Sequence, residues 1–114
     1  MDRPAHLIVL AAAVLSACGE NPAIRQAKKA VTAAMRDPES ARFTDVRMCG
    51  RSNVVTGKVN GRNAFGGYTG AQDFYFGEGG VAFQGSPDMA ESQRWIRLSA
   101  MCTSADNQAA DKAR

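Results

Sequence analysis

Residues 73–83 read Asp-Phe-Tyr-Phe-Gly-Glu-Gly-Gly-Val-Ala-Phe and predict two antiparallel strands joined by a tight turn. Side chains alternate along a strand, so Phe74 and Phe76 share one face and Tyr75 lies on the other. Residues 77–80 turn the chain, and Val81 and Phe83 share a face of the returning strand. An antiparallel sheet is therefore the centre of the expected fold.

Two weaker strand patterns precede this pair, at residues 43–48 and 53–59. Together the segments predict an antiparallel meander of three or four strands over residues 43–83. Asn60-Gly61 is a strong signal for a two-residue hairpin turn. Alternatively, the strand runs on through Asn60 into an irregular loop, and the three glycines within residues 66–70 are typical of a bulge or wide turn.

A helix is expected before the sheet, over residues 22–36. Asn21-Pro22 combines a capping residue with proline at the first helical position, and apolar residues then recur every three or four positions. The other side of this helix is basic (Arg25, Lys28, Lys29 and Arg36). This basic face is either an ordinary solvated surface or one that lies against anionic lipid headgroups.

A second helix is expected after the sheet, opened by Ser86-Pro87 and ending near Cys102. Trp95 is expected to fill the core between this helix and the sheet. The alternation of apolar residues from Ile96 to Cys102 would also fit a strand. Residues 103–114 contain no large apolar residue and are expected to form a disordered tail.

The N-terminal segment ends in Leu15-Ser16-Ala17-Cys18, which resembles the lipobox of bacterial lipoproteins. The apolar run before it, residues 7–15, is shorter than the roughly 20 residues that cross a bilayer and fits a secretory signal. The resemblance implies that residues 1–17 are a signal peptide and that Cys18 is the acylated first residue of the mature chain. Residues 18–21 then link a membrane to the domain. Gly19, in place of Asp, favours the outer membrane, with the domain facing the periplasm.

Two cysteines remain once Cys18 is assigned to the lipid. In an oxidising envelope Cys49 and Cys102 are expected to form a disulfide. Two buried free thiols or an intermolecular bridge are the alternatives. The expected architecture is therefore α+β. It comprises one domain over residues 22–102, with an N-terminal amphipathic helix, the meander, a C-terminal helix and one disulfide.

The composition excludes several kinds of function. The net charge of +3 is spread along the chain, which argues against a nucleic-acid partner. His6 is the only histidine and leaves with the signal peptide. The mature chain therefore has no residues for Ser-His-Asp or Cys-His catalysis or for an imidazole zinc site. No cofactor and no metal are expected.

Two motifs resemble those of a small domain found in short bacterial and prophage-borne envelope proteins. Residues 37–43 fit D-P-x-S-A-x-F, and residues 57–70 fit G-x-V-N-x-x-N-x-F-G-G-Y-x-G. The resemblance covers roughly residues 25–102. It implies an envelope domain and carries no particular activity with it.

A non-enzymatic binding or accessory module, held on a membrane by its lipid, is the expected function. The partner would be an envelope protein or a cell-wall polymer. The candidate binding loop carries Arg62, Asn63, Phe65 and Tyr68; alternatively, its aromatic residues fold back onto the sheet. A second hypothesis is a cell-wall glycan hydrolase that uses the carboxylates of Asp73 and Glu78.

Overall fold

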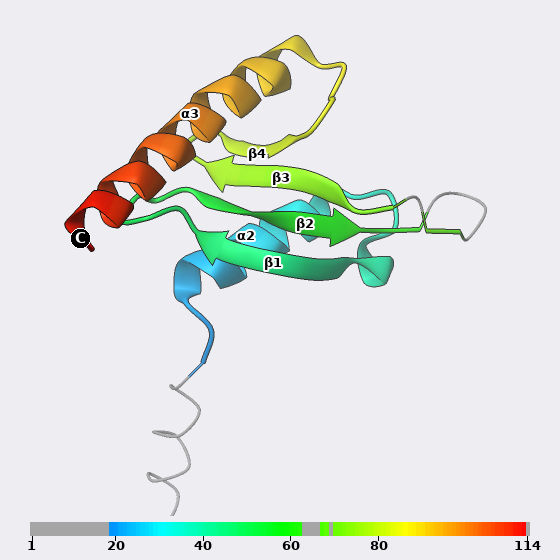
Figure 1. Cartoon of the computed structure of the whole chain (residues 1–114). Coiled ribbons are helices and arrows are strands. Elements are labelled where there is room, and N and C mark those ends of the chain that lie inside the picture. The colour runs from blue at the N-terminus through cyan, green and yellow to red at the C-terminus, as the bar shows by residue number, and fades with distance from the viewer. Residues whose placement is uncertain (1–18, 63–66, 69, 114) are drawn as a thin grey trace, which may run out of the picture.

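The computed structural model describes residues 19–62, 67–68 and 70–113. This part of the chain contains two α-helices and a four-stranded antiparallel sheet, which confirms the α+β prediction (Figure 1). Along the chain the elements are α2 (Pro22–Ala33), the 3-10 helix η2 (Pro38–Ser40), β1 (Arg42–Met48), β2 (Val55–Asn60), β3 (Gln72–Gly77), β4 (Gly80–Phe83) and α3 (Met89–Lys112).

The strand order is β1-β2-β3-β4, so every strand pairs with its neighbour in sequence, as a meander requires. In the β3–β4 hairpin, Gly77 pairs with Gly80 across a two-residue turn. By contrast, β2 and β3 are joined by a loop over residues 61–71, because Val59 pairs with Gln72. The prediction of a tight turn at Asn60-Gly61 is therefore wrong, and the alternative of a strand entering a long loop is confirmed.

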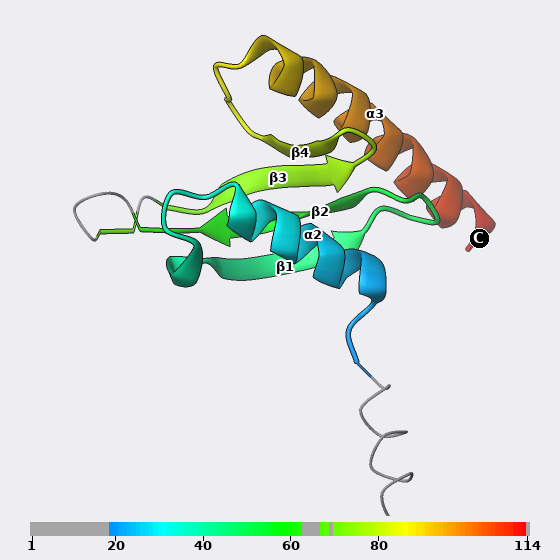
Figure 2. The same ribbon diagram turned by 180° about the vertical axis from the view of Figure 1, so that it is seen from behind.

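Helix α2 covers one face of the sheet (Figure 2). The side-chain oxygen of Asn21 accepts a hydrogen bond from the Ala23 amide at 2.8 Å, which caps the helix as predicted. The helix ends at Ala33, three residues earlier than expected. Its buried residues, Ala27 and Val31, pack against alternate side chains of the central strands (Val55, Val59 and Phe74).

The core beneath α2 depends on a glycine in β2. Gly57 lies opposite Phe74 in the strand register. A Cβ atom at Gly57 would lie 3.1 Å from the Phe74 ring and 2.9 Å from the side chain of Val46. With that space free, the Phe74 ring extends towards β1 and meets Phe43 edge-on, with 6.0 Å between ring centroids.

Helix α3 crosses the opposite face of the sheet near β3 and β4 (Figures 1 and 2). Leu98 is fully buried there, with Cys49, Val54 and Cys102 around it. Trp95 is only half-buried and packs edge-on against Tyr75, with 4.8 Å between centroids. The prediction that Trp95 fills the core is therefore wrong: Leu98, three residues further along the helix, occupies that place.

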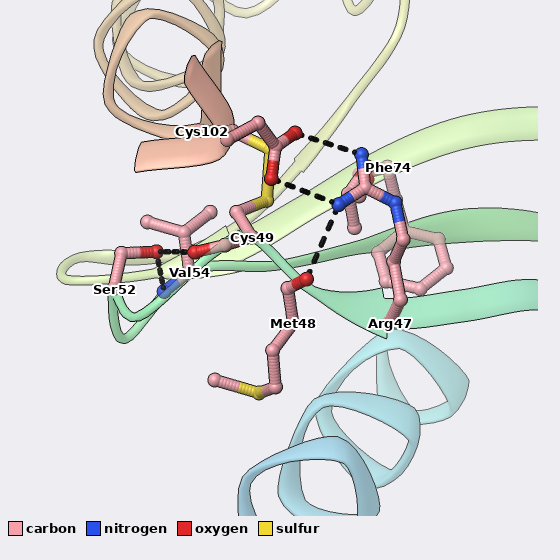
Figure 3. The surroundings of a disulfide bond; sticks show 9 residues. Arg47, Met48, Cys49, Ser52, Val54, Phe74 and Cys102 are labelled. Carbon is pink, nitrogen blue, oxygen red and sulfur yellow. Dashed lines mark hydrogen bonds and ion pairs between the residues drawn. A yellow bond between two sulfur atoms is a disulfide. The ribbon is translucent and has the colours of Figure 1, made fainter. Parts of the chain in front are cut away.

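The predicted disulfide joins Cys49, just after β1, to Cys102 in α3 (Figure 3). Both cysteines are buried.

Beside the disulfide, the guanidinium of Arg47 donates two hydrogen bonds to the Asp106 carboxylate, at 3.1 and 3.0 Å. These bonds hold the pKa of Asp106 below its ordinary value of 3.8. Their stabilisation is therefore present at neutral pH and is lost as the pH falls through that lowered pKa. Because both side chains are more than a third exposed, the pair contributes at most about 1 kcal/mol.

Gly50 lets the turn after β1 approach α3 closely. Its φ of +52° lies in the left-handed region that favours glycine. A Cβ atom there would also overlap the backbone of Ala105 in α3. The disulfide, the Arg47–Asp106 pair and Gly50 thus act together at one junction between the sheet and the second half of α3.

Helix α3 also protects one edge of the sheet. The carboxylate of Glu91 accepts a hydrogen bond from the Phe83 amide at 2.8 Å, and Arg94 donates to the Val81 carbonyl at 2.7 Å. These backbone groups belong to β4, the last strand, and would otherwise point away from the sheet. Side chains of α3 thus form hydrogen bonds with the edge of β4 where another strand could otherwise pair.

The C-terminal residues depart from expectation. Helix α3 begins at Met89, with Asp88 as its cap, and continues to Lys112. The prediction of a disordered tail over residues 103–114 is therefore wrong as far as Lys112. The tail lacks large apolar residues, but residues 103–112 extend a helix that is already anchored at Leu98 and Cys102, and they include the Asp106 carboxylate that binds Arg47.

We expect removal of the disulfide to lower the free energy of unfolding by about 4 kcal/mol, because the bridge closes a loop of more than 50 residues in the unfolded chain. The variant is Cys49→Ala with Cys102→Ala, measured by urea denaturation. The control is the wild-type protein with and without reducing agent, which should show the same loss. A reduced wild type that unfolds at the same urea concentration as the oxidised protein would contradict the prediction.

Candidate functional site

The loop that joins β2 to β3 lies at the end of the sheet remote from the start of α2 (Figures 1 and 2). Asn60 ends β2 and Gln72 begins β3 at this end. Cys18 precedes the start of α2 at Pro22 by four residues, so the chain enters the domain at the opposite end of the sheet from this loop. Of the predicted loop residues, Arg62 and Tyr68 are described, whereas Asn63 and Phe65 lie outside the described residues, as does Cys18.

A buried serine fastens this loop to the turn before β1. The Ser40 hydroxyl donates to the Asp37 carbonyl at 2.7 Å and accepts a hydrogen bond from the Arg62 amide at 2.9 Å. Ser40 is only 4% exposed, so the loss of either bond would leave a polar group without water to replace it. Ser40 therefore connects the D-P-x-S-A-x-F segment to the glycine-rich segment.

Tyr68 is held on the surface by two contacts. Its hydroxyl donates to the Ser40 carbonyl at 3.3 Å, and the guanidinium of Arg42 lies 4.2 Å from its ring centroid. The side chain stays 37% exposed. The structure thus gives Tyr68 a fixed position with one ring face covered by a cation, which differs from both a free loop residue and a residue packed into the core.

Three further contacts close the base of the loop. Arg62 forms an isolated β-bridge with Tyr68, and its guanidinium lies 3.6 Å from the Asp37 carboxylate. The side-chain oxygen of Asn60 accepts a hydrogen bond from the Gly70 amide at 3.1 Å. The loop therefore leaves and re-enters the sheet along a path fixed by side chains of both motifs.

A hollow of about 330 Å³ adjoins the base of the loop. Apolar side chains line part of it, and two arginines lie beside them: Arg36, which is exposed, and Arg62, which is paired with Asp37. The apolar lining residues are Ala34, Met35, Val59 and Phe83. This arrangement suits an apolar group with a negative charge next to it.

The two carboxylates of the hydrolase hypothesis are not brought together. The Asp73 carboxylate forms an ion pair with Lys58 at 2.7 Å, and Glu78 lies in the exposed turn after β3. From Asp73 to Gly77 the strand rises about 13 Å, and Glu78 lies beyond Gly77 in the turn. Paired glycosidase carboxylates lie about 5 to 9.5 Å apart. The geometry therefore does not support this pair.

The face of the sheet that α3 leaves open carries a second, shallower hollow of about 250 Å³. Asp45, Lys58 and Asp73 line it, with Tyr75 and Trp95 at one side. Asp45 has a φ of +55° at an irregularity in the β1–β2 pairing, which redirects the chain there. This hollow is not predictable from the sequence, because a bulge at an aspartate has no clear signal in a strand pattern.

In the described part of the chain, no group of three or more His, Cys, Asp or Glu side chains is arranged to hold a metal ion. None of the helices described there combines the length and apolar character needed to cross a membrane.

Comparison of the chain with protein-family models, with curated proteins and with solved structures found no match.

Sequence patterns predict Arg62 and Tyr68 in the candidate loop but give no sign of Ser40 and Arg42, which hold them. The two motifs named for the resemblance contain all four residues. A small buried hydroxyl next to a helix-breaking Asp37-Pro38 gives no sign of a partner more than 20 residues away. Its role becomes visible only when the loop is placed beside it.

We expect Ser40→Ala to lower the free energy of unfolding by about 1–3 kcal/mol, because it leaves the Arg62 amide without its partner. Tyr68→Ala should cost less, about 1 kcal/mol, since it removes one long hydrogen bond and one exposed cation–π contact. Urea denaturation of both variants tests this order. The control is Ser99→Ala, because the half-buried Ser99 hydroxyl donates to the Ile96 carbonyl within α3, in a bond that is open to solvent. If Tyr68→Ala lowered the free energy of unfolding by about 3–5 kcal/mol, as truncation of a core aromatic residue does, the predicted order would be wrong.

Proposed function

We propose that this protein is a bacterial envelope lipoprotein, anchored by acylated Cys18, that works as a non-enzymatic binding module. The site is the end of the sheet formed by Arg62, Tyr68 and the adjacent hollow. The observation that carries the proposal is the fixed, exposed position of Tyr68 between Arg42 and the Ser40 carbonyl.

A side chain that is already held in place loses little conformational entropy when a partner binds, and that saving appears as affinity. Tyrosine and arginine are also the residues most often found at energetic hot spots of protein interfaces. The hollow next to Arg62 offers apolar surface beside positive charge. These features favour a protein partner that presents an apolar side chain next to an acidic one.

The anchor rests on the lipobox resemblance and on two features of the domain. Only residues 19–21 lie between Cys18 and the first residue of α2, so a lipid on Cys18 would hold the domain at the membrane surface. Two or more acyl chains are needed for a stable attachment, and lipoprotein processing supplies them. The buried Cys49–Cys102 disulfide suits the oxidising envelope outside the inner membrane.

The anchor is tested by metabolic labelling. The wild-type protein should incorporate labelled palmitate and partition into detergent, whereas Cys18→Ala should remain an unlabelled, unprocessed precursor. Wild-type protein recovered unlabelled in the soluble periplasmic fraction would refute the lipoprotein assignment.

The binding site is tested by crosslinking the native lipoprotein in cells and identifying the captured proteins by mass spectrometry. Tyr68→Ala should reduce capture of the main partner by tenfold or more, as expected for loss of about 1.4 kcal/mol at a hot spot. Met89→Ala is the matched control, because Met89 is an exposed apolar residue on α3, away from the loop. If folded Tyr68→Ala captured as much partner as Met89→Ala, the loop end would no longer be a candidate site.

A further inference from the structure

The exposed side of α2 carries positive charge and no negative charge. The helix spans Pro22–Ala33 and contains no Asp or Glu. Arg25 and Lys29 are one turn apart and both exposed, and they lie on the side of the helix opposite the buried Ala27 and Val31. They therefore point away from the sheet.

The nearest acidic residue does not cancel these charges. Glu20 binds Lys28, with 2.6 Å between the carboxylate oxygen and the ammonium nitrogen. Lys28 is also turned back towards the domain, 5.7 Å from the centre of the Phe43 ring. Arg25 and Lys29 are left as the exposed cations of this face.

The chain length before α2 sets how far this face can lie from a membrane. Four residue steps separate Cys18 from Pro22, and a fully extended chain covers at most about 3.6 Å per step, or roughly 14 Å. Attraction between charges extends over a Debye length of about 8 Å at physiological ionic strength. A lipid on Cys18 therefore holds the first turns of α2 close to the range in which anionic headgroups attract them.

We propose that the outer face of α2, marked by Arg25 and Lys29, docks on anionic phospholipid headgroups and sets the orientation of the domain on the membrane. This inference rests on the proposed lipid anchor. In the docked state the sheet lies above α2. Helix α3 then lies on the side of the sheet remote from the membrane, because the two helices cover opposite faces (Figure 2). The hollow lined by Asp45, Lys58 and Asp73, with Tyr75 of β3 and Trp95 of α3 at one side, then faces the periplasm.

Lysine footprinting of the acylated full-length protein tests the proposal. The protein is reconstituted in vesicles of phosphatidylcholine alone or of phosphatidylcholine mixed with phosphatidylglycerol, then acetylated and read by mass spectrometry. The measured quantity is the labelling rate of Lys29 divided by that of Lys112. Lys112, an exposed lysine in the last turn of α3, is the internal control. The ratio should fall several-fold when phosphatidylglycerol is present and recover at high salt. An equal ratio on both vesicles would overturn docking.

Two matched variants locate the effect on α2. Arg25→Glu should restore most of the Lys29 labelling on the anionic vesicles, because even the loss of one basic charge near such a surface weakens association about fivefold. Arg51→Glu makes the same charge change at an exposed residue in the turn after β1 and should leave Lys29 protected. Equal effects of the two variants would overturn a specific role for α2.

Flotation of the same vesicles separates this proposal from the one on which it rests. A chain that floats with an unchanged labelling ratio would overturn docking alone. A chain that floats with neither vesicle would overturn the anchor and the docking together.

Discussion

The link between the turn after β1 and helix α3 is the constraint on which the rest of the domain depends. The Cys49–Cys102 bond crosses from the sheet to the helix, and the Arg47–Asp106 pair lies beside it. In so small a domain the hydrophobic core alone leaves little stability in reserve. Fixing α3 at this point brings Glu91 and Arg94 to the edge of β4 and Leu98 to the core. A covalent bond at one end of the sheet thus helps to position Glu91, Arg94 and Leu98 of α3 against the strands.

Much of this fold follows from local patterns in the sequence. The alternation of Phe74, Tyr75 and Phe76 predicts a strand with aromatic side chains on both faces, and the structure places α2 on the face of Phe74 and α3 on that of Tyr75. The disulfide follows from counting cysteines, given the oxidising compartment that the lipobox resemblance implies. The capped start of α2 follows from Asn21-Pro22. These features depend on neighbouring residues or on composition, so they can be seen without the tertiary structure.

The features that sequence patterns missed depend on contacts between distant segments. Residues 103–112 have the composition of a tail, yet they continue a helix that Leu98 and Cys102 already anchor. The sequence predicts Trp95 in the core, but the crossing position of α3 places Leu98 there and leaves Trp95 against Tyr75. The clamp of Ser40 on Arg62 joins two motifs that periodicity treats separately. The place of Arg62 and Tyr68 in the loop could be predicted, but not the residues that hold them.

The bulge at Asp45 bears on how such chains behave when many are confined to one surface. Confinement raises the effective concentration of neighbouring copies, and a flat strand edge invites them to join into a continuous sheet. The edge of β4 is occupied by side chains of α3. The edge of β1 is interrupted at Asp45, where the chain takes a φ of +55°. This break in the strand works against edge-to-edge pairing of neighbouring copies.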